Sequence, residues 1–129
     1  MTSKFKLSMR SKSRLQGVHP DLVAVVNRAI EITTIDFGVT EGLRTVERQK
    51  ILVGQGASTT MNSRHITGHA VDLVAFIGAE VRWDWPLYHK IADAMKTSAK
   101  ELNVLIEWGG DWRTFKDGPH FQLGRKNYP

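Results

Sequence analysis

The sequence predicts an α+β fold: a single compact domain in which a small antiparallel sheet packs against helices. Segments with helical periodicity and short apolar segments follow one another without the regular strand–helix–strand alternation of a parallel sheet. The 129 residues, 41% of them hydrophobic, suffice for one ordinary core, and neither an internal repeat nor a linker divides them. We therefore expect one domain over residues 1–129.

Three segments carry the apolar spacing of helices. In residues 20–33 apolar side chains recur at intervals of three and four, and Pro20 suits the first turn of a helix. A second helix is expected after Thr45, whose hydroxyl can cap it, as far as about Val53. Residues 86–102 form the longest helical pattern, with one apolar stripe along it.

Four short segments are predicted to be strands, namely residues 36–40, 70–77, 104–108 and 120–123. The second is an apolar run that contains a single charge, Asp72, and such a run is typical of a buried strand. A Gly-Gly pair directly after the third segment predicts a turn. The irregular order of these strands and the helices favours an antiparallel sheet.

The composition excludes several classes of protein. The chain contains no cysteine, so a metal ion would have to be held by histidines and carboxylates rather than by thiolates. No apolar stretch approaches about 18 residues, which argues against a membrane span. The basic start of the chain is not followed by an apolar segment, so we expect no secretory signal. A protein of this kind that acts outside the cytoplasm would need another way out.

The net charge of +5 is concentrated at the start of the chain. Five basic residues precede the first acid, Asp21, and make residues 1–19 a basic arm: Lys4, Lys6, Arg10, Lys12 and Arg14. Such an arm suits an anionic partner, for example lipid headgroups or a cell-wall polymer, and it equally suits a solvated surface. No recognised nucleic-acid motif accompanies it, so we expect no nucleic-acid partner.

Two clusters of side chains offer the chemistry of metal-assisted hydrolysis. His65 and Asp72 lie seven residues apart; Asp117 follows 45 residues after Asp72, and His120 three residues later. Two histidines and one aspartate make a three-ligand zinc site with an open fourth position, and a spare carboxylate such as Asp117 can accept a proton from water. The alternatives are an Asp72 held by backbone amides or an arginine, and a His120 that belongs to the core.

The motifs resemble a known family. The pattern Ser-x-His-x-x-Gly-x-Ala-x-Asp, read from Ser63 to Asp72, resembles the VanY-like D-alanyl-D-alanine carboxypeptidase family of zinc peptidases. Within that family the chain is most similar to the L-alanyl-D-glutamate endopeptidases that serve as phage endolysins. The resemblance extends over roughly residues 20–123 and includes Gly42-Leu43-Arg44-Thr45 and the stretch 108–112. It implies a fold of the hedgehog and D-Ala-D-Ala peptidase type.

The resemblance also implies roles for the two clusters. His65, Asp72 and His120 would bind one Zn²⁺ per chain. The catalytic carboxylate of the family stands three residues before the last histidine, a place that Asp117 fills here. Many members have glutamate at this place, whereas this chain has the shorter aspartate. Asp117 would then act as the general base.

The arginine of the first motif corresponds to Arg44. The resemblance implies that Arg44 holds a substrate carboxylate or polarises the scissile carbonyl, and a guanidinium suits either task because it donates two parallel hydrogen bonds. From the residues alone, the competing interpretation is a surface salt bridge between Arg44 and Glu41 or Glu47.

Further substrate contacts are expected from three side chains. Ser63, two residues before the first ligand, is expected to bind substrate or to orient that ligand. Gln49 follows the arginine motif on the expected second helix and is predicted to line the cleft. Trp108, with Trp112 on the other side of the Gly-Gly turn, is predicted to wall the peptide-binding cleft.

The sequence and its resemblance together favour a zinc-dependent peptidoglycan peptidase. We expect it to cleave the L-Ala–D-Glu bond of the stem peptide and to act, as a monomer, as a phage endolysin. It would remain in the host cytoplasm until a membrane lesion releases it to the cell wall. Two alternatives stay open: a D,D-carboxypeptidase or dipeptidase acting on D-Ala-D-Ala, and a non-catalytic, zinc-containing wall-binding module. A free carboxylate at position 117 argues against the second.

Overall fold

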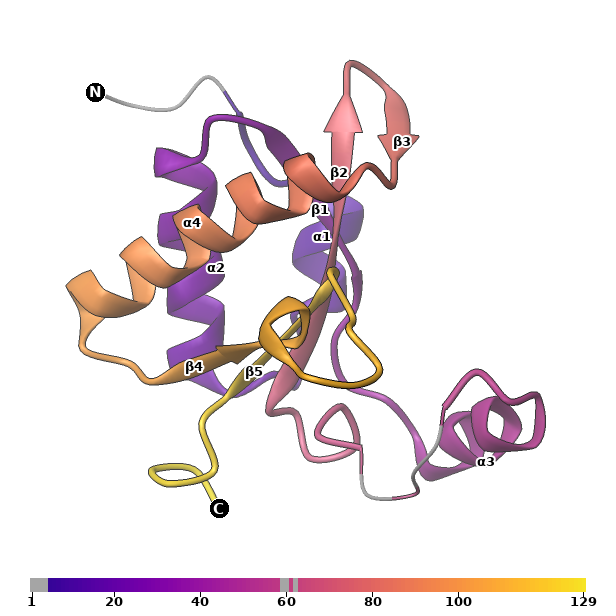
Figure 1. The fold of residues 1–129 in the computed structure, drawn as a ribbon. Coiled ribbons are helices and arrows are strands. Elements are labelled where there is room, and N and C mark those ends of the chain that lie inside the picture. The colour runs from indigo at the N-terminus through magenta and orange to yellow at the C-terminus, as the bar shows by residue number, and fades with distance from the viewer. Residues whose placement is uncertain (1–4, 59–60, 62) are drawn as a thin grey trace.

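The computed structural model describes residues 5–58, 61 and 63–129 and shows helices packed on one small antiparallel sheet (Figure 1). The sheet has the strand order β1-β2-β5-β4, and β3 pairs with the end of β2. The elements are α1 (Met9–Arg14), α2 (Pro20–Ile32), β1 (Asp36–Glu41), α3 (Val46–Gly54), β2 (Ala70–Ile77), β3 (Glu80–Arg82), α4 (Trp85–Leu102), β4 (Ile106–Trp108), the 3₁₀ turn η1 (Gly109–Asp111) and β5 (His120–Leu123).

The predicted α+β class is confirmed, and the main helices and strands lie where the sequence predicts them. The side chain of Thr45 caps α3 by accepting a hydrogen bond from the Arg48 amide at 3.0 Å. The third predicted strand is shorter at its start, because Asn103 and Val104 terminate α4. Asn103 adopts a left-handed conformation with φ of 57°, and the Val104 amide bonds back to Ala99 O. The short β3 was not predicted.

The core lies between α2, α4 and one face of the sheet (Figure 1). Both helices bury their apolar stripe, and the hydroxyl of Ser98 on α4 joins them by donating to Val25 O of α2 at 2.7 Å. The sheet contributes alternate side chains to this core, for example Val71, Leu73 and Phe121. None of the helices in the described part of the chain is both long and apolar enough to cross a bilayer.

The basic N-terminal segment differs from the expected arm, because most of its described part belongs to the domain. Leu7, Leu15 and Val18 are buried in the core, and α1 packs on the outer edge of β1. Ser11 Oγ accepts a hydrogen bond from the Val39 amide at 2.9 Å, so α1 satisfies a backbone group that an edge strand would otherwise leave open. Of the five basic residues, Lys4 lies outside the described residues, and the other four have exposed side chains.

Candidate active site

Two carboxylates and one imidazole, those of Glu41, Asp72 and His120, form a row across three neighbouring strands. Asp72 of β2 pairs with Glu41 of β1 on one side and with His120 of β5 on the other. Because side chains alternate along a strand and Val71 and Leu73 point into the core, Asp72 points to the opposite face, away from α2 and α4. An irregularity in the ladder between Val39 and Glu41 brings Glu41 into this row.

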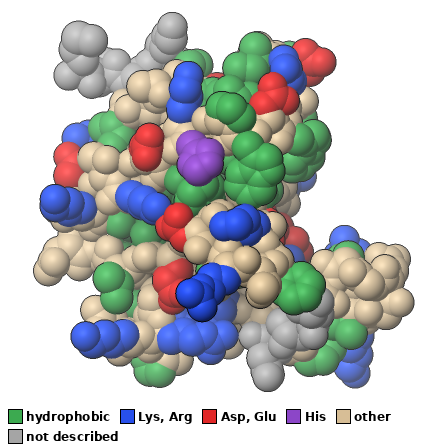
Figure 2. All heavy atoms as spheres, viewed as in Figure 1, with side chains coloured by type: hydrophobic (Ala, Val, Ile, Leu, Met, Phe, Trp, Pro, Cys, Tyr) green, Lys and Arg blue, Asp and Glu red, His purple; other side chains and the backbone are tan. Residues whose placement is uncertain are grey.

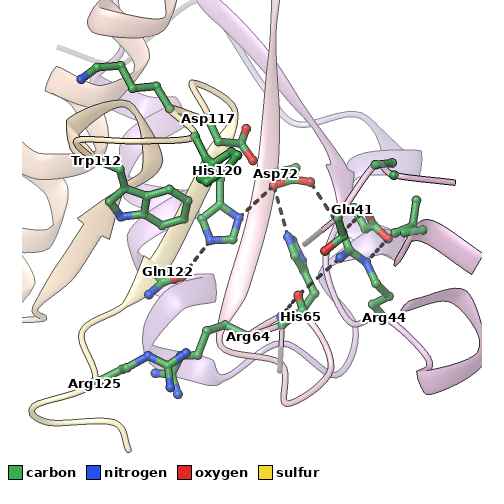
Figure 3. Close-up of a pocket in the computed structure, with 17 residues that line it drawn as sticks. Glu41, Arg44, Arg64, His65, Asp72, Trp112, Asp117, His120, Gln122 and Arg125 are labelled. Carbon is green, nitrogen blue, oxygen red and sulfur yellow. Dashed lines mark hydrogen bonds and ion pairs between the residues drawn. The ribbon is translucent and has the colours of Figure 1, made fainter. Parts of the chain in front are cut away.

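His65, Asp72 and His120 form a group of possible metal ligands, whose ligand atoms all lie within 4.8 Å of one another. The Nε2 of His65 lies 3.2 Å from Oδ1 of Asp72, and the Nδ1 of His120 lies 3.3 Å from the same oxygen. His65 arrives from the loop before β2, so the three residues come from a loop and two adjacent strands (Figure 3). The structure thus brings together the three residues that the sequence predicts as metal ligands.

In each of the two histidines, the ring nitrogen that points away from Asp72 contacts a carbonyl oxygen. Nδ1 of His65 lies 2.9 Å from Gly42 O, and Nε2 of His120 lies 2.9 Å from Oε1 of Gln122. These acceptors hold a ring proton on Nδ1 of His65 and on Nε2 of His120, so the other ring nitrogens, which lie beside Asp72, are the ones that can coordinate a metal in place of their contacts with Asp72. Two imidazoles and a carboxylate without thiolates are a donor set that fits zinc.

Electrostatics keep the carboxylate of Asp72 ionised in the absence of a metal. Burial raises the pKa of Asp72, but hydrogen bonds from His120 and His65 and their positive charge outweigh it and hold this pKa well below its usual range. For His120, burial lowers the pKa, while the hydrogen bond and charge of Asp72 outweigh burial and raise it. The carboxylate is therefore ionised, as a metal ligand must be.

Asp117 lies beside the ligand group without belonging to it. It lines the same cleft, and Figure 3 shows its carboxylate near that of Asp72. Burial and the negative charge of Asp72 raise the pKa of Asp117. Its amide donates to Gly109 O at 3.0 Å, and a Cβ on Gly109 would come within 2.4 Å of Asp117 O. A glycine is therefore required where η1 holds the Asp117 loop.

Arg44 is fully engaged within the protein. Its Nε and Nη2 donate to the two carboxylate oxygens of Glu41 at 2.7 and 2.6 Å, and Nη1 donates to Gln49 Oε1 at 2.7 Å and to Ser63 Oγ at 3.3 Å. Nη2 also lies 3.9 Å from Asp72. The expected salt bridge with Glu41 exists, but it is buried rather than superficial, with the Arg44 side chain 8% exposed.

The two polar side chains predicted to contact substrate hold other groups in place. Gln49 is completely buried and does not line the cleft; its Oε1 accepts from Arg44, and its Nε2 donates to Ser58 Oγ at 2.8 Å. The prediction of a substrate contact for Gln49 is therefore wrong, because the helix turns this side chain inward. Ser63 does line the cleft, and its hydroxyl accepts from the His65 amide at 3.2 Å.

Trp108 does not wall the cleft either. It is 3% exposed, its Nε1 donates to Gly118 O at 2.7 Å, and its ring stacks on Phe121 at 6.3 Å between centroids. The reason is register: Trp108 pairs with Phe121 across β4 and β5, and both side chains point to the helical face. Trp112 lines the cleft instead, with its ring 5.2 Å from that of His120.

Arg64 and Arg125 form a second cationic part of the cleft, which the sequence analysis missed. Arg64 is buried, and its Nη2 donates to the carbonyl oxygens of Leu123, at 3.1 Å, and Tyr128. Burial lowers the pKa of Arg64, the nearby charge of Arg125 lowers it further, and Glu107 acts in the opposite direction. Figure 3 shows both guanidinium groups on the same side of the cleft, across the ligand group from Arg44.

The whole cleft has a volume of about 800 Å³, within the usual range for a ligand site. Besides the predicted residues it is lined by side chains that sequence reasoning did not select, among them Glu41, Arg64, Phe115, Lys116, Gln122 and Arg125. One signal was available for Gln122: it stands two residues after His120 in a strand, and such residues share a face. For Phe115, Lys116 and Arg125 the sequence offers no comparable signal.

Comparison with known proteins gives a consistent result. The model of the phage L-alanyl-D-glutamate peptidase family matches residues 3–123. The L-alanyl-D-glutamate peptidase of Escherichia phage T5 is 31% identical over 128 residues, covering 96% of this chain and 93% of that protein. That of Listeria phage A118 is 41% identical over 98 residues, covering 76% of this chain but 34% of the Listeria phage protein.

A solved structure agrees with these relatives. The crystal structure of the Serratia marcescens L-Ala D-Glu endopeptidase ChiX superposes with a TM-score of 0.91 at 48% sequence identity, and the match covers 96% of this chain and 94% of ChiX. The resemblance to L-alanyl-D-glutamate endopeptidases drawn from the sequence motifs is confirmed by sequence relatives and by the fold alike. The chain belongs to the phage L-alanyl-D-glutamate peptidase family.

Proposed function

We propose that the protein is a zinc-dependent peptidoglycan peptidase that hydrolyses the L-Ala–D-Glu bond of the stem peptide. One observation carries the proposal: a ligand group of two histidines and one aspartate shares a cleft with the uncoordinated carboxylate of Asp117. A purely structural zinc site has no use for such a carboxylate. The names of the relatives, which are peptidases for this bond, support the choice of substrate.

The chemistry follows from the arrangement of side chains. Zinc, held by His65, Asp72 and His120, would supply a Lewis acid and lower the pKa of water to near neutral. Asp117 accepts the proton of the attacking water and passes it to the departing amine of D-glutamate. Arg44 contributes a positive charge beside the ligand group, which favours the negative charge that develops on the scissile carbonyl oxygen.

Arg44 acts here as a fixed charge rather than as a fork for a substrate carboxylate. Its donors are already used by Glu41, Gln49 and Ser63, which hold the guanidinium in one orientation. Such preorganisation is what electrostatic stabilisation of a transition state requires, because the dipoles and charges need not move during the reaction. The ion pair with Glu41 therefore supports catalysis instead of competing with it.

The proposal includes an endolysin role for a monomeric enzyme. Its support is the match to a phage peptidase family and to peptidases of two phages. In this role the protein reaches the peptidoglycan after release from the host cytoplasm through a membrane lesion. The exposed basic side chains of Lys6, Arg10 and Lys12 would then face an anionic cell-envelope surface.

Digestion of defined stem peptides tests the proposal. The protein is incubated with L-Ala-γ-D-Glu-L-Lys-D-Ala-D-Ala, with and without a chelator, and the fragments are identified by mass. We expect free L-alanine and the remaining tetrapeptide, and no cleavage in chelator until zinc is restored. Release of D-alanine with the L-Ala–D-Glu bond intact would establish the carboxypeptidase alternative. Absence of any cleavage at full zinc occupancy would favour the non-catalytic module.

A further inference from the structure

Two guanidinium groups of the cleft, those of Arg64 and Arg125, form no ion pair with an acid among the described residues, and Glu107 acts on Arg64 only through its more distant charge. The side chain of Arg125 has neither a hydrogen bond nor an ion pair within the part of the chain that the structure describes. Beside it, Arg64 is 6% exposed, and its buried Nε lacks a hydrogen-bond partner among the described residues. Two adjacent cations, one of them buried, are unfavourable without a counter-charge.

The acids of the cleft are committed elsewhere. Glu41 binds Arg44 through both oxygens, and Asp72 lies between the two imidazoles. Figure 3 places Asp117 on the far side of the ligand group from Arg64 and Arg125. Lys and Arg side chains also gather around the C-terminal segment on the face in Figure 2, so the surroundings add further positive charge. This end of the cleft is suited to an anion.

We propose that Arg125, backed by Arg64, forms a carboxylate subsite for the part of the stem peptide that begins with D-glutamate. The inference rests on the proposed function, because the scissile bond places that part of the substrate in this cleft. It also assigns to Arg125 the task of carboxylate binding that the sequence analysis gave to Arg44, whose donors are occupied. The exposed side chain of Arg125 retains a free guanidinium fork for the purpose.

Two carboxylates of the substrate have the required chemistry. In a stem peptide the D-glutamate is linked through its γ-carboxyl, so its α-carboxylate stays free and is bonded to the same carbon as the scissile nitrogen. The third residue supplies a further carboxylate when it is meso-diaminopimelate and none on its side chain when it is lysine. Either would be bound as a charge-assisted ion pair, and amidation or replacement by lysine would remove the charge.

The test measures binding with uncleavable peptides, in which a methyleneamine replaces the scissile amide. Four analogues of L-Ala-γ-D-Glu-X, each amidated at the C-terminal carboxyl of X, combine a free or amidated α-carboxylate of D-glutamate with lysine or meso-diaminopimelate as X. Calorimetry gives their affinities for the zinc-loaded wild type, for Arg125→Gln and for Lys126→Gln. Lys126 is the matched control, because it is an exposed neighbouring cation that does not line the cleft.

We expect Arg125→Gln to weaken binding about tenfold for the analogues that carry the recognised carboxylate, and to leave the others unchanged. A loss confined to the free α-carboxylate identifies D-glutamate as the ligand, and a loss confined to meso-diaminopimelate identifies the third residue. Equal weakening of all four analogues, no weakening, or the same pattern with Lys126→Gln would overturn the subsite. Because cleavage is measured separately, a protein that shows this discrimination but releases D-alanine would refute the proposed function alone.

Discussion

Replacing Gln122 by leucine tests whether the geometry around His120 sets the affinity for zinc. Gln122 is 7% exposed, and its Oε1 is the acceptor for Nε2 of His120 at 2.9 Å. In the metal-bound state the ring must keep its proton on Nε2, because Nδ1 is committed to the metal. Without the acceptor, the metal-free ring can move its proton to Nδ1, where Asp72 lies 3.3 Å away. The cost of the substitution therefore falls on the metal-bound state.

The size of the effect follows from this argument. A buried N–H group without a partner costs about 1–3 kcal/mol. Since about 1.4 kcal/mol corresponds to a tenfold change in an equilibrium constant, Gln122→Leu should weaken zinc binding by roughly 10- to 100-fold. Gln122→Glu retains an acceptor oxygen at the same place and should bind zinc at least as tightly as the wild type.

Competition with a chromophoric chelator measures both affinities, and thermal unfolding of the zinc-free proteins controls for the fold. The expected result is a lower affinity for Gln122→Leu, with Gln122→Glu near or above the wild type. If Gln122→Leu folds normally and binds zinc within about twofold of the wild type, then the hydrogen bond to Gln122 does not orient His120, and the reasoning is refuted.

Three further substitutions test the ligand set and the catalytic groups. His120→Ala should lose most of its zinc by metal analysis, and full occupancy would remove His120 from the ligand set. Asp117→Asn should keep zinc and fold but lose peptidase activity by about 10² or more, so near-normal turnover would assign the base elsewhere. Arg44→Lys should lower both kcat/KM and the melting temperature, because lysine cannot bind both oxygens of Glu41; unchanged values of both would contradict this role.

The fold could be predicted wherever a segment carries its own pattern. The helical stripe of α4 and the apolar run of β2 are local signals, and both elements were predicted nearly to the residue. α1 carries no such signal, since it has six residues and depends on tertiary contacts such as that between Ser11 and the Val39 amide. The three residues of β3, two of them charged, form a strand because the end of β2 offers them a partner.

The site could be predicted in its chemistry but not in its supporting contacts. Residue type and spacing made His65, Asp72 and His120 candidates for metal binding, because few side chains bind metal, and the family resemblance selected them. Which of two tryptophans faces the cleft depends on the register of β4 against β5, and that register pairs Trp108 with Phe121. No single-sequence pattern contains that information, so Trp112 was given a secondary place.

The same dependence on register ties the metal group to the fold as a whole. Asp72 and His120 are 48 residues apart in sequence and become neighbours only because β2 pairs antiparallel with β5. A slip of one residue in that pairing would turn one of the two side chains to the core face. His65 in turn needs the carbonyl of Gly42, and a Cβ on Gly42 would come within 2.2 Å of Arg14 O. The ligand group thus exists only in the folded domain, so a metal that binds it stabilises sheet, loop and N-terminal segment together.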